Sequence, residues 1–464
     1  MNSTTIPRSS LTLSQFRDRL GAGLIGPDDA AYDEARLVWN ALIDRRPALI
    51  ARCRSAEEVA LCIRFARQHG CRLAVRGGGH NIAGKAVCEG GLVIDLSLMK
   101  AVEVDSATCR ARVGGGATWA DLDAAAQAHG LATPGGVVST TGVGGLTLGG
   151  GLGRLSRAFG LSADNLTAAE VVTAEGVLLN ASATEHADLF WAVRGGGGNF
   201  GVVTRFEFAL HRVGPEVLFG VLVYPLEQAP EVLRHYRDFA RAAPRESAIW
   251  LDCVTAPPLP FLPEQVHGTP VVMVAPFYVG DLDEGESMLR PLREFGEPLA
   301  DVVERQPYAA TQSALDALFE AGARNYWRSC NYAEMADGVL DVVVDFAARF
   351  PSPQSDILIA HVGGAIADIS PHATAYPHRN AQFIVSPGAR WMDPADDDRC
   401  LSWVRECGDA LAKFPTAGTY VNFVTEEQGR ERAAYGSNYD RLAAVKAKYD
   451  PENVFSMNQN VRPQ

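Results

Sequence analysis

Short apolar runs and helical spacing alternate in the first third of the chain. The runs at 48–51, 73–75 and 92–96 are rich in Val, Ile and Leu, which is typical of buried strands. Between the first two runs, Ser55 with Glu58 forms a capping box and Gly70 supplies a helix stop. The pattern predicts a strand, a helix and further strands in succession.

Farther along, the period of the pattern changes to two. Polar and apolar residues alternate at 102–105, 109–113 and 202–210, which predicts half-buried strands. A hairpin is expected from 168–173 and 177–180, and Thr118 caps a helix that ends at Gly130. We place the end of this first domain near Val213.

Beyond residue 213, glycine becomes rarer and proline more frequent. Strands expected at 271–278 and 356–362 alternate with helices near 230–242 and 341–349, which predicts an α+β domain with an antiparallel sheet covered by helices. After Gly418 we expect a strand at Tyr420–Phe423 and a helix at 439–448. Including a leader with a helix around Leu13–Leu20, the chain divides into residues 1–45, 46–213, 214–415 and 416–464.

Glycine is the composition signal that changes this picture. The chain has 45 glycines in 464 residues, and 26 of them lie between Gly77 and Gly201. They come in clusters among apolar runs and without a Gly-X-Y period, which excludes collagen and argues against a flexible linker. Such glycines indicate places where the backbone approaches another group closely.

Charge and cysteine usage exclude several classes of function. The net charge of −13 argues against nucleic acid or an anionic membrane surface as a partner. The nine cysteines form no C-x-x-C pair, and His361 and His378 have no second ligand nearby, so no metal site is expected. Without a signal pattern or a run of 18 apolar residues, we expect a cytoplasmic protein.

Two phosphate-binding motifs occur in the glycine-rich region, and both fail in their context. Gly79 to Lys85 matches G-x-x-x-x-G-K, but Ala86 replaces the Ser or Thr that would hold Mg²⁺. Gly196 to Gly201 matches G-x-G-x-x-G, but the expected strand at 202–210 follows it instead of a helix. Neither a nucleotide triphosphatase nor a Rossmann site is therefore supported.

A third arrangement remains, in which consecutive glycines form an anion-binding nest. Arg76-Gly77-Gly78-Gly79-His80-Asn81 follows a strand directly, and successive glycine N–H groups can turn toward one anion. His80 ends this motif, either as a ligand-contacting residue or as an ordinary turn histidine.

Three ordered motifs resemble the berberine bridge enzyme-like FAD-linked oxidases of the vanillyl-alcohol oxidase superfamily. Residues 75–84 resemble the family's FAD attachment loop, and 133–153 resemble its second flavin loop. Asn422, Tyr435-Gly436, 438–442 and 451–460 resemble its C-terminal segment. The resemblance implies a two-domain α+β fold of the PCMH type, in which 416–464 completes the FAD domain around the substrate domain.

In that family a histidine in the first loop carries FAD on its 8α-methyl carbon, and His80 occupies this place. Many relatives add a second link from a cysteine, where this chain has Val138, so a single covalent link is expected. The resemblance implies a cofactor site made of Arg76, Gly77, Gly78, Gly79, His80, Asn81, Gly84, Pro134, Gly135, Val138, Thr140, Thr141, Gly142, Gly144, Gly145, Gly149, Gly150, Gly153, Asn199, Gly201, Val202, Asn422, Asn458 and Asn460.

The resemblance also implies the chemistry: hydride transfer from a small organic alcohol or amine to flavin, with dioxygen as acceptor and hydrogen peroxide as product. Tyr420 is the candidate base or substrate-orienting group, and the substrate candidates are Tyr326, Tyr332, Gln382 and Ser386. A sugar or alcohol dehydrogenase with another electron acceptor and a non-catalytic flavin-binding protein stay as alternatives.

Overall fold

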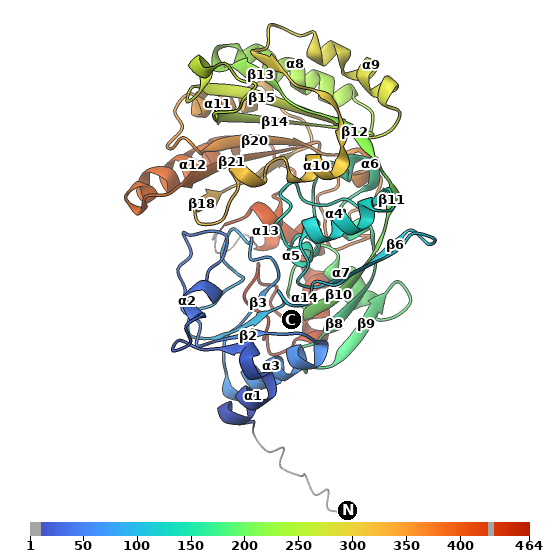
Figure 1. Ribbon diagram of the computed structural model, residues 1–464, viewed down its shortest axis with the longest axis vertical. Helices are drawn as coiled ribbons and strands as arrows, with labels where there is room; N and C mark the ends of the chain where they lie inside the picture. Colours follow the sequence, from blue (N-terminus) through green and yellow to red (C-terminus); the bar gives the residue numbers. More distant parts are fainter. Residues whose placement is uncertain (1–10, 426–430) are drawn as a thin grey trace, which may run out of the picture.

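The computed structural model describes residues 11–425 and 431–464, which form a lower part with two small sheets and an upper part with one large sheet (Figure 1). In the first small sheet three strands are parallel, a short strand pairs antiparallel at one edge, and two helices pack against it. These elements are β1 (Leu24–Ile25), β2 (Leu49–Arg52), β4 (Leu92–Asp95), β3 (Leu73–Arg76), α1 (Leu13–Leu20) and α3 (Ala56–His69).

The second small sheet is antiparallel and has five strands in the order β5-β6-β10-β8-β9. Side chains of its strands and of three helices, the last of them from the C-terminal segment, share one apolar core. The elements are β5 (Val102–Asp105), β6 (Arg110–Gly114), β10 (Val202–Ala209), β8 (Leu166–Val172), β9 (Leu178–Ser182), α4 (Trp119–Gln127), α7 (Ala187–Val193) and α14 (Tyr439–Tyr449).

The large sheet has ten antiparallel strands, and four helices cover its face that points away from the lower part (Figure 1). Its strands are β12 (Glu216–Phe219), β13 (Leu222–Pro225), β14 (Ser247–Thr255), β15 (Pro270–Tyr278), β16 (Ala300–Asp301), β17 (Glu304–Pro307), β18 (Arg324–Trp327), β19 (Cys330–Tyr332), β20 (Asp356–His361) and β21 (Phe383–Trp391). The helices are α8 (Ala229–Ala242), α9 (Leu282–Arg293), α11 (Asp337–Ala347) and α12 (Asp397–Leu411).

Shorter elements connect the two parts, and one of them corrects an expectation. The expected strand at Tyr420–Phe423 is instead a 3-10 turn over Val421–Phe423, because these residues find no neighbouring strand. The glycine-rich stretch 132–160 contains two short helices that the pattern did not reveal. The remaining elements are α2 (Tyr32–Ala35), α5 (Val143–Leu148), α6 (Ser156–Phe159), α10 (Tyr308–Ser313), α13 (Glu431–Tyr435), β7 (Leu131–Ala132) and β11 (His211–Arg212).

The end of the leader, around Asn40, packs between the two parts. Asn40 is fully buried, donates from Nδ2 to the carbonyls of Ile82 (2.8 Å) and Asn325 (2.9 Å), and accepts from the N–H of Asn325 (2.8 Å). It therefore joins the loop after β3 to strand β18. Residues 1–10, the start of this leader, lie outside the described part. Within the described ranges, no helix combines the length and the apolar character needed to cross a bilayer.

Candidate functional site

A cavity of about 1030 Å³ lies between the glycine-rich loops of the lower part and the large sheet. Among the residues expected from the sequence, its lining includes Gly77, Gly78, Gly79, His80, Asn81, Val138, Thr141, Gly142, Gly144, Gly145, Gly149, Gly201, Val202, Ser386, Tyr420, Asn422 and Asn458. Three loops far apart in sequence thus meet around one space. Its volume is at the upper end of the range for ligand sites.

The two glycine loops touch each other at Gly78 and Gly142. A Cβ on Gly78 would lie 2.4 Å from the backbone nitrogen of Gly142, and a Cβ on Gly142 would lie 2.3 Å from that of Gly78. Any side chain at either position would push the loops apart, since real Cβ atoms do not come this close. This contact places His80, two residues later, above the second loop.

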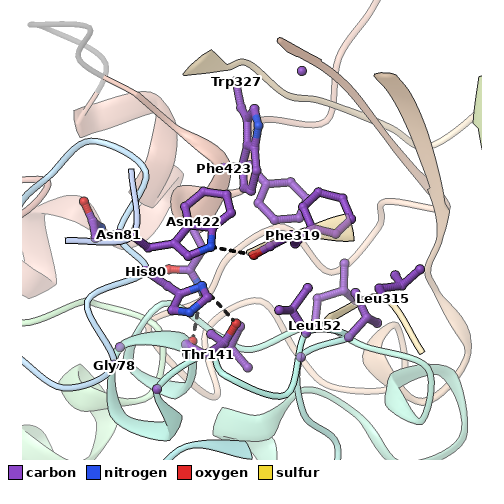
Figure 2. Close-up of a pocket in the computed structure, with 18 of the residues that line it drawn as sticks. Gly78, His80, Asn81, Thr141, Leu152, Leu315, Phe319, Trp327, Asn422 and Phe423 are labelled. Carbon is purple, nitrogen blue, oxygen red and sulfur yellow. Dashed lines mark hydrogen bonds between the residues drawn. The ribbon is translucent and has the colours of Figure 1, made fainter. Parts of the chain in front are cut away.

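His80 is held by two threonines and one aromatic ring, and Figure 2 shows it beside Thr141. Its Nε2 lies 3.1 Å from Oγ1 of Thr140 and its Nδ1 lies 3.5 Å from Oγ1 of Thr141. The Trp39 ring stacks on the imidazole with centroids 5.3 Å apart. Burial lowers the pKa of His80 to about 4, against which Asp316 acts weakly. The imidazole is therefore neutral at physiological pH, with a lone pair on one ring nitrogen.

Tyr420 and Asn422 line the cavity and bind the backbone of the second glycine loop. The Tyr420 hydroxyl accepts from the N–H groups of Gly151 (3.2 Å) and Leu152 (3.1 Å) and from Nδ2 of Asn422 (3.0 Å). Nδ2 of Asn422 also donates to the Leu146 carbonyl at 3.0 Å. Burial raises the pKa of Tyr420 to about 12, so the phenol stays protonated across the neutral range.

The C-terminal tail is fastened to the loop at 195–201. Asn199 is fully buried, donates from Nδ2 to the carbonyls of Gly196 (2.8 Å) and Gln459 (3.1 Å), and accepts from the Val461 N–H at 2.9 Å. Asn458 donates to the Gly198 carbonyl at 3.0 Å, while its buried Oδ1 has no partner among the described residues. The tail therefore supplies an unused acceptor at the cavity wall.

The backbone around the cavity fits a flat cofactor such as FAD. A Cβ built on Gly145 or Gly198 meets no atom within 4 Å, and both residues line the cavity. Protein packing gives no reason for glycine at these two positions, whereas a ligand against the backbone does. Together with the cavity volume and the free acceptor of Asn458, this open cradle can hold the ring system and the diphosphate.

Some residues expected in the site lie outside the cavity lining. Arg76 is buried in an ion pair with Asp95 (2.7 Å). Tyr326 and Tyr332 point into the core under the helices, because they sit at strand positions that face away from the cavity, and Tyr332 donates to the Leu411 carbonyl. The other such residues are Gly84, Pro134, Gly135, Thr140, Gly150, Gly153, Asn199, Gln382 and Asn460.

Several lining residues were not found from the sequence. Trp39 comes from the leader, Phe423 adds an aromatic ring beside Trp327 (Figure 2), and Asp252 and Asp356 are acidic residues of the large sheet. No motif marks them, because each is a single residue in a region where the fold decides which side chains face the cavity. The alternation of side chains along a strand was the one available signal.

Comparisons with known proteins identify the family of the chain. Residues 47–182 match the family described as FAD binding domain, and residues 419–462 match berberine and berberine like. The (R)-6-hydroxynicotine oxidase of Paenarthrobacter nicotinovorans is 35% identical, over 95% of this chain and 96% of the relative. An FAD-linked oxidoreductase of Dictyostelium discoideum is 31% identical, over 92% and 91%.

A solved structure supports the same assignment. The crystal structure of 6-hydroxy-D-nicotine oxidase from Arthrobacter nicotinovorans has a TM-score of 0.85 and 32% sequence identity, and the match covers 95% of this chain and 98% of that one. The α+β architecture is that of the PCMH-type FAD-binding oxidases. The chain belongs to the berberine bridge enzyme-like FAD-linked oxidoreductases and is an FAD-dependent enzyme.

Proposed function

We propose that this protein is an oxidase whose FAD is bound covalently through His80 alone. A small organic alcohol or amine loses a hydride from carbon and a proton from oxygen or nitrogen. Bound FAD would supply the hydride acceptor, and dioxygen would take up the two electrons and two protons as hydrogen peroxide. The protein contributes binding, orientation and the exclusion of water.

The setting of His80 is the observation that carries the proposal. A neutral imidazole, fixed by Thr140, Thr141 and Trp39, offers a nitrogen lone pair at the edge of the cavity. With FAD bound, this nitrogen would hold its 8α carbon: the new bond would replace one imidazole N–H and one methyl C–H bond, and dioxygen would take up the two electrons and two protons. Val138 lines the cavity, and no cysteine is among the described lining residues, which supports a single link.

The hydrogen bonds and the raised pKa of Tyr420 favour a role in orienting the substrate over a role as general base, the two roles expected from the sequence. Its hydroxyl accepts three hydrogen bonds, and no described residue accepts its proton, so this proton can be donated toward a substrate oxygen or nitrogen. A phenol with a pKa of about 12 is a poor base near neutrality. We therefore assign it the orientation of substrate.

Acid precipitation of the purified protein tests the covalent link. Yellow colour should remain with the pellet of the wild-type protein and of His129→Ala, a control at an exposed histidine. The His80→Ala variant should release all of its flavin to the supernatant. A colourless wild-type pellet would refute the link, and a yellow His80→Ala pellet would refute the assignment to a single histidine.

Anaerobic mixing separates the alternatives. An oxidase bleaches the flavin absorbance with substrate and recovers it in air, with one hydrogen peroxide formed for each turnover. Bleaching with slow recovery in air and fast recovery with an added dye would identify a dehydrogenase. If no compound in a panel of amines, alcohols and sugars bleaches the flavin, the non-catalytic flavin-binding alternative gains support.

A further inference from the structure

Two acidic side chains face the cavity from the large sheet. Along β14 the residues Trp250, Asp252 and Val254 share the face that lines the cavity, and along β20 the residues Asp356 and Leu358 do the same. Asp252 pairs with Leu358 and Val254 pairs with Asp356 in the strand register. The two aspartates are therefore diagonal neighbours, with Cα atoms roughly 7–8 Å apart.

Strand β21 leaves room for one of these carboxyls. Gly388 lies directly opposite Asp356, and a Cβ on Gly388 would be 2.5 Å from Oδ1 of Asp356 and 3.0 Å from the Trp327 ring. The missing side chain lets the carboxyl lie flat beside the indole. An acidic group and an aromatic ring thus share one corner of the cavity.

Aromatic contacts connect this corner to the flavin-linking residue. Trp327 lies 5.7 Å, centroid to centroid, from both Trp39 and Phe423. Trp39 stacks on His80, and Phe423 lies 4.9 Å from the Tyr420 ring. A molecule that touches Trp327 and Phe423, which Figure 2 labels, can therefore extend toward the acidic pair at one end and toward His80, the proposed flavin link, at the other.

The charge around the pair is unbalanced. Arg390 is the cation next to Asp356, and its guanidinium lies over the Trp39 ring and donates to the Glu320 carbonyl at 2.5 Å. One arginine cannot neutralise two carboxylates, and Oδ1 of Asp252 has no hydrogen-bond partner among the described residues. Burial raises the pKa of Asp356 to about 7 and raises that of Asp252 as well. A second positive charge would stabilise both ionised carboxylates.

We propose that the cavity takes substrates with a positively charged amine, whose ammonium group binds between Asp252 and Asp356 while the apolar part lies against Trp327 and Phe423. Carboxylates beside aromatic faces are the usual way in which proteins bind ammonium groups. This inference rests on the proposed oxidase function and narrows its alcohol or amine to an amine.

Calorimetric titration of the holoenzyme tests the inference without turnover. Benzyltrimethylammonium is a suitable probe because its nitrogen has no lone pair and therefore cannot drive hydride loss, and benzyl alcohol serves as the neutral probe. The cation should bind wild type at least about tenfold more tightly than the alcohol does. Asp252→Asn and Asp356→Asn should each weaken binding of the cation at least about tenfold. Each should leave the affinity for the alcohol within about twofold of the wild-type value.

Controls make the outcome specific. Asp398→Asn removes an exposed acid outside the cavity lining and should leave both affinities unchanged. Arg390→Gln should tighten binding of the cation, because it removes a competing positive charge. This variant keeps the test valid if an aspartate variant fails to fold. Equal binding of cation and alcohol by wild type, or a cation affinity unchanged in Asp252→Asn/Asp356→Asn, would overturn the inference.

Anaerobic mixing of the same preparations with benzylamine, other arylalkyl amines, alcohols and sugars separates this inference from the oxidase function. Flavin bleaching by a neutral alcohol or sugar alone, with no preference for the cation in the titration, overturns the amine inference and leaves the oxidase intact. Aspartate-dependent cation binding without bleaching by any compound overturns the oxidase function and leaves the cation site standing.

Discussion

Removal of the buried lysine of α14 should both destabilise the protein and lower its flavin content. The side chains of Lys446 and Asp450 are fully buried, and Nζ donates to Oδ2 of Asp450 (2.6 Å) and to the carbonyls of Asn199 (2.7 Å) and Phe455 (2.9 Å). Lys446→Met fills most of the volume but leaves a buried carboxylate without its cation. Breaking such a pair costs about 3–5 kcal/mol.

The value for this site should lie near the lower end of that range. Oδ1 of Asp450 still accepts from the Val454 N–H (2.7 Å) and Oδ2 from that of Phe455 (2.9 Å), so the orphaned carboxylate keeps two donors. We expect a loss of about 3 kcal/mol in the free energy of unfolding, measured from urea curves followed by tryptophan fluorescence. Bound flavin per protein should fall too, because Lys446 holds the backbone at Asn199 beside the cavity.

Two variants decide whether the reasoning is correct. Lys448→Met removes an exposed lysine of the same helix, which pairs with Asp188 at the surface, and should change neither stability nor flavin content appreciably. Lys446→Met/Asp450→Asn removes both charges but keeps a side-chain oxygen that can accept from the Val454 and Phe455 N–H groups, so it should recover most of the lost stability. Equal losses for Lys446→Met and Lys448→Met, or a double variant no more stable than Lys446→Met, would refute the account.

Three further predictions concern the cavity. Tyr420→Phe removes the acceptor of three hydrogen-bond donors and should lower kcat at least about tenfold. The pH profile of the wild-type rate should show no change near pH 8–10 from this phenol, whose pKa is about 12. Gly145→Leu should keep the fold, judged by circular dichroism, but lower the flavin content, since its side chain enters the cradle. Asp356→Asn should raise the free energy of unfolding at pH 8 by up to about 4 kcal/mol and leave it nearly unchanged at pH 4. The folded pKa of about 7 lies above the unfolded value, so the wild-type carboxyl costs stability as the pH rises from 4 to 7. Equal pH dependence of thermal unfolding in Asp356→Asn and wild type would contradict the last.

Local signals located most elements of the lower part. The helix at Leu13–Leu20, the capped helix α3 and the alternating strand β10 lie within two residues of their expected bounds, because each has its own cap or period. The turn at Val421–Phe423 was mistaken for a strand, since apolar residues around a polar one satisfy either conformation. Only the absence of a pairing partner decides between them, and this is a tertiary property.

The same limit explains which site residues the sequence revealed. The glycine loops and His80 are recognisable because close backbone approach demands a rare local composition. The large sheet is different: one face packs under helices and the other lines the cavity, so β21 is buried at every position from Phe383 to Trp391. Hydrophobic alternation, which depends on one exposed face, is lost in such a strand.

That geometry also explains why Trp327 lines the cavity and Tyr326 does not. Tyr326 pairs with Ala389 on the helix-covered face, whereas its neighbour Trp327 pairs with Gly388 on the other face, beside Asp356. Once a single residue is assigned to the cavity, period two assigns the rest of its strand and, through the register, the strands beside it. Asp252 and Asp356 therefore lie on the same face of the sheet as Trp327. Removing a charge from either aspartate should change which substrates bind and leave the glycine loops that face the flavin unaffected.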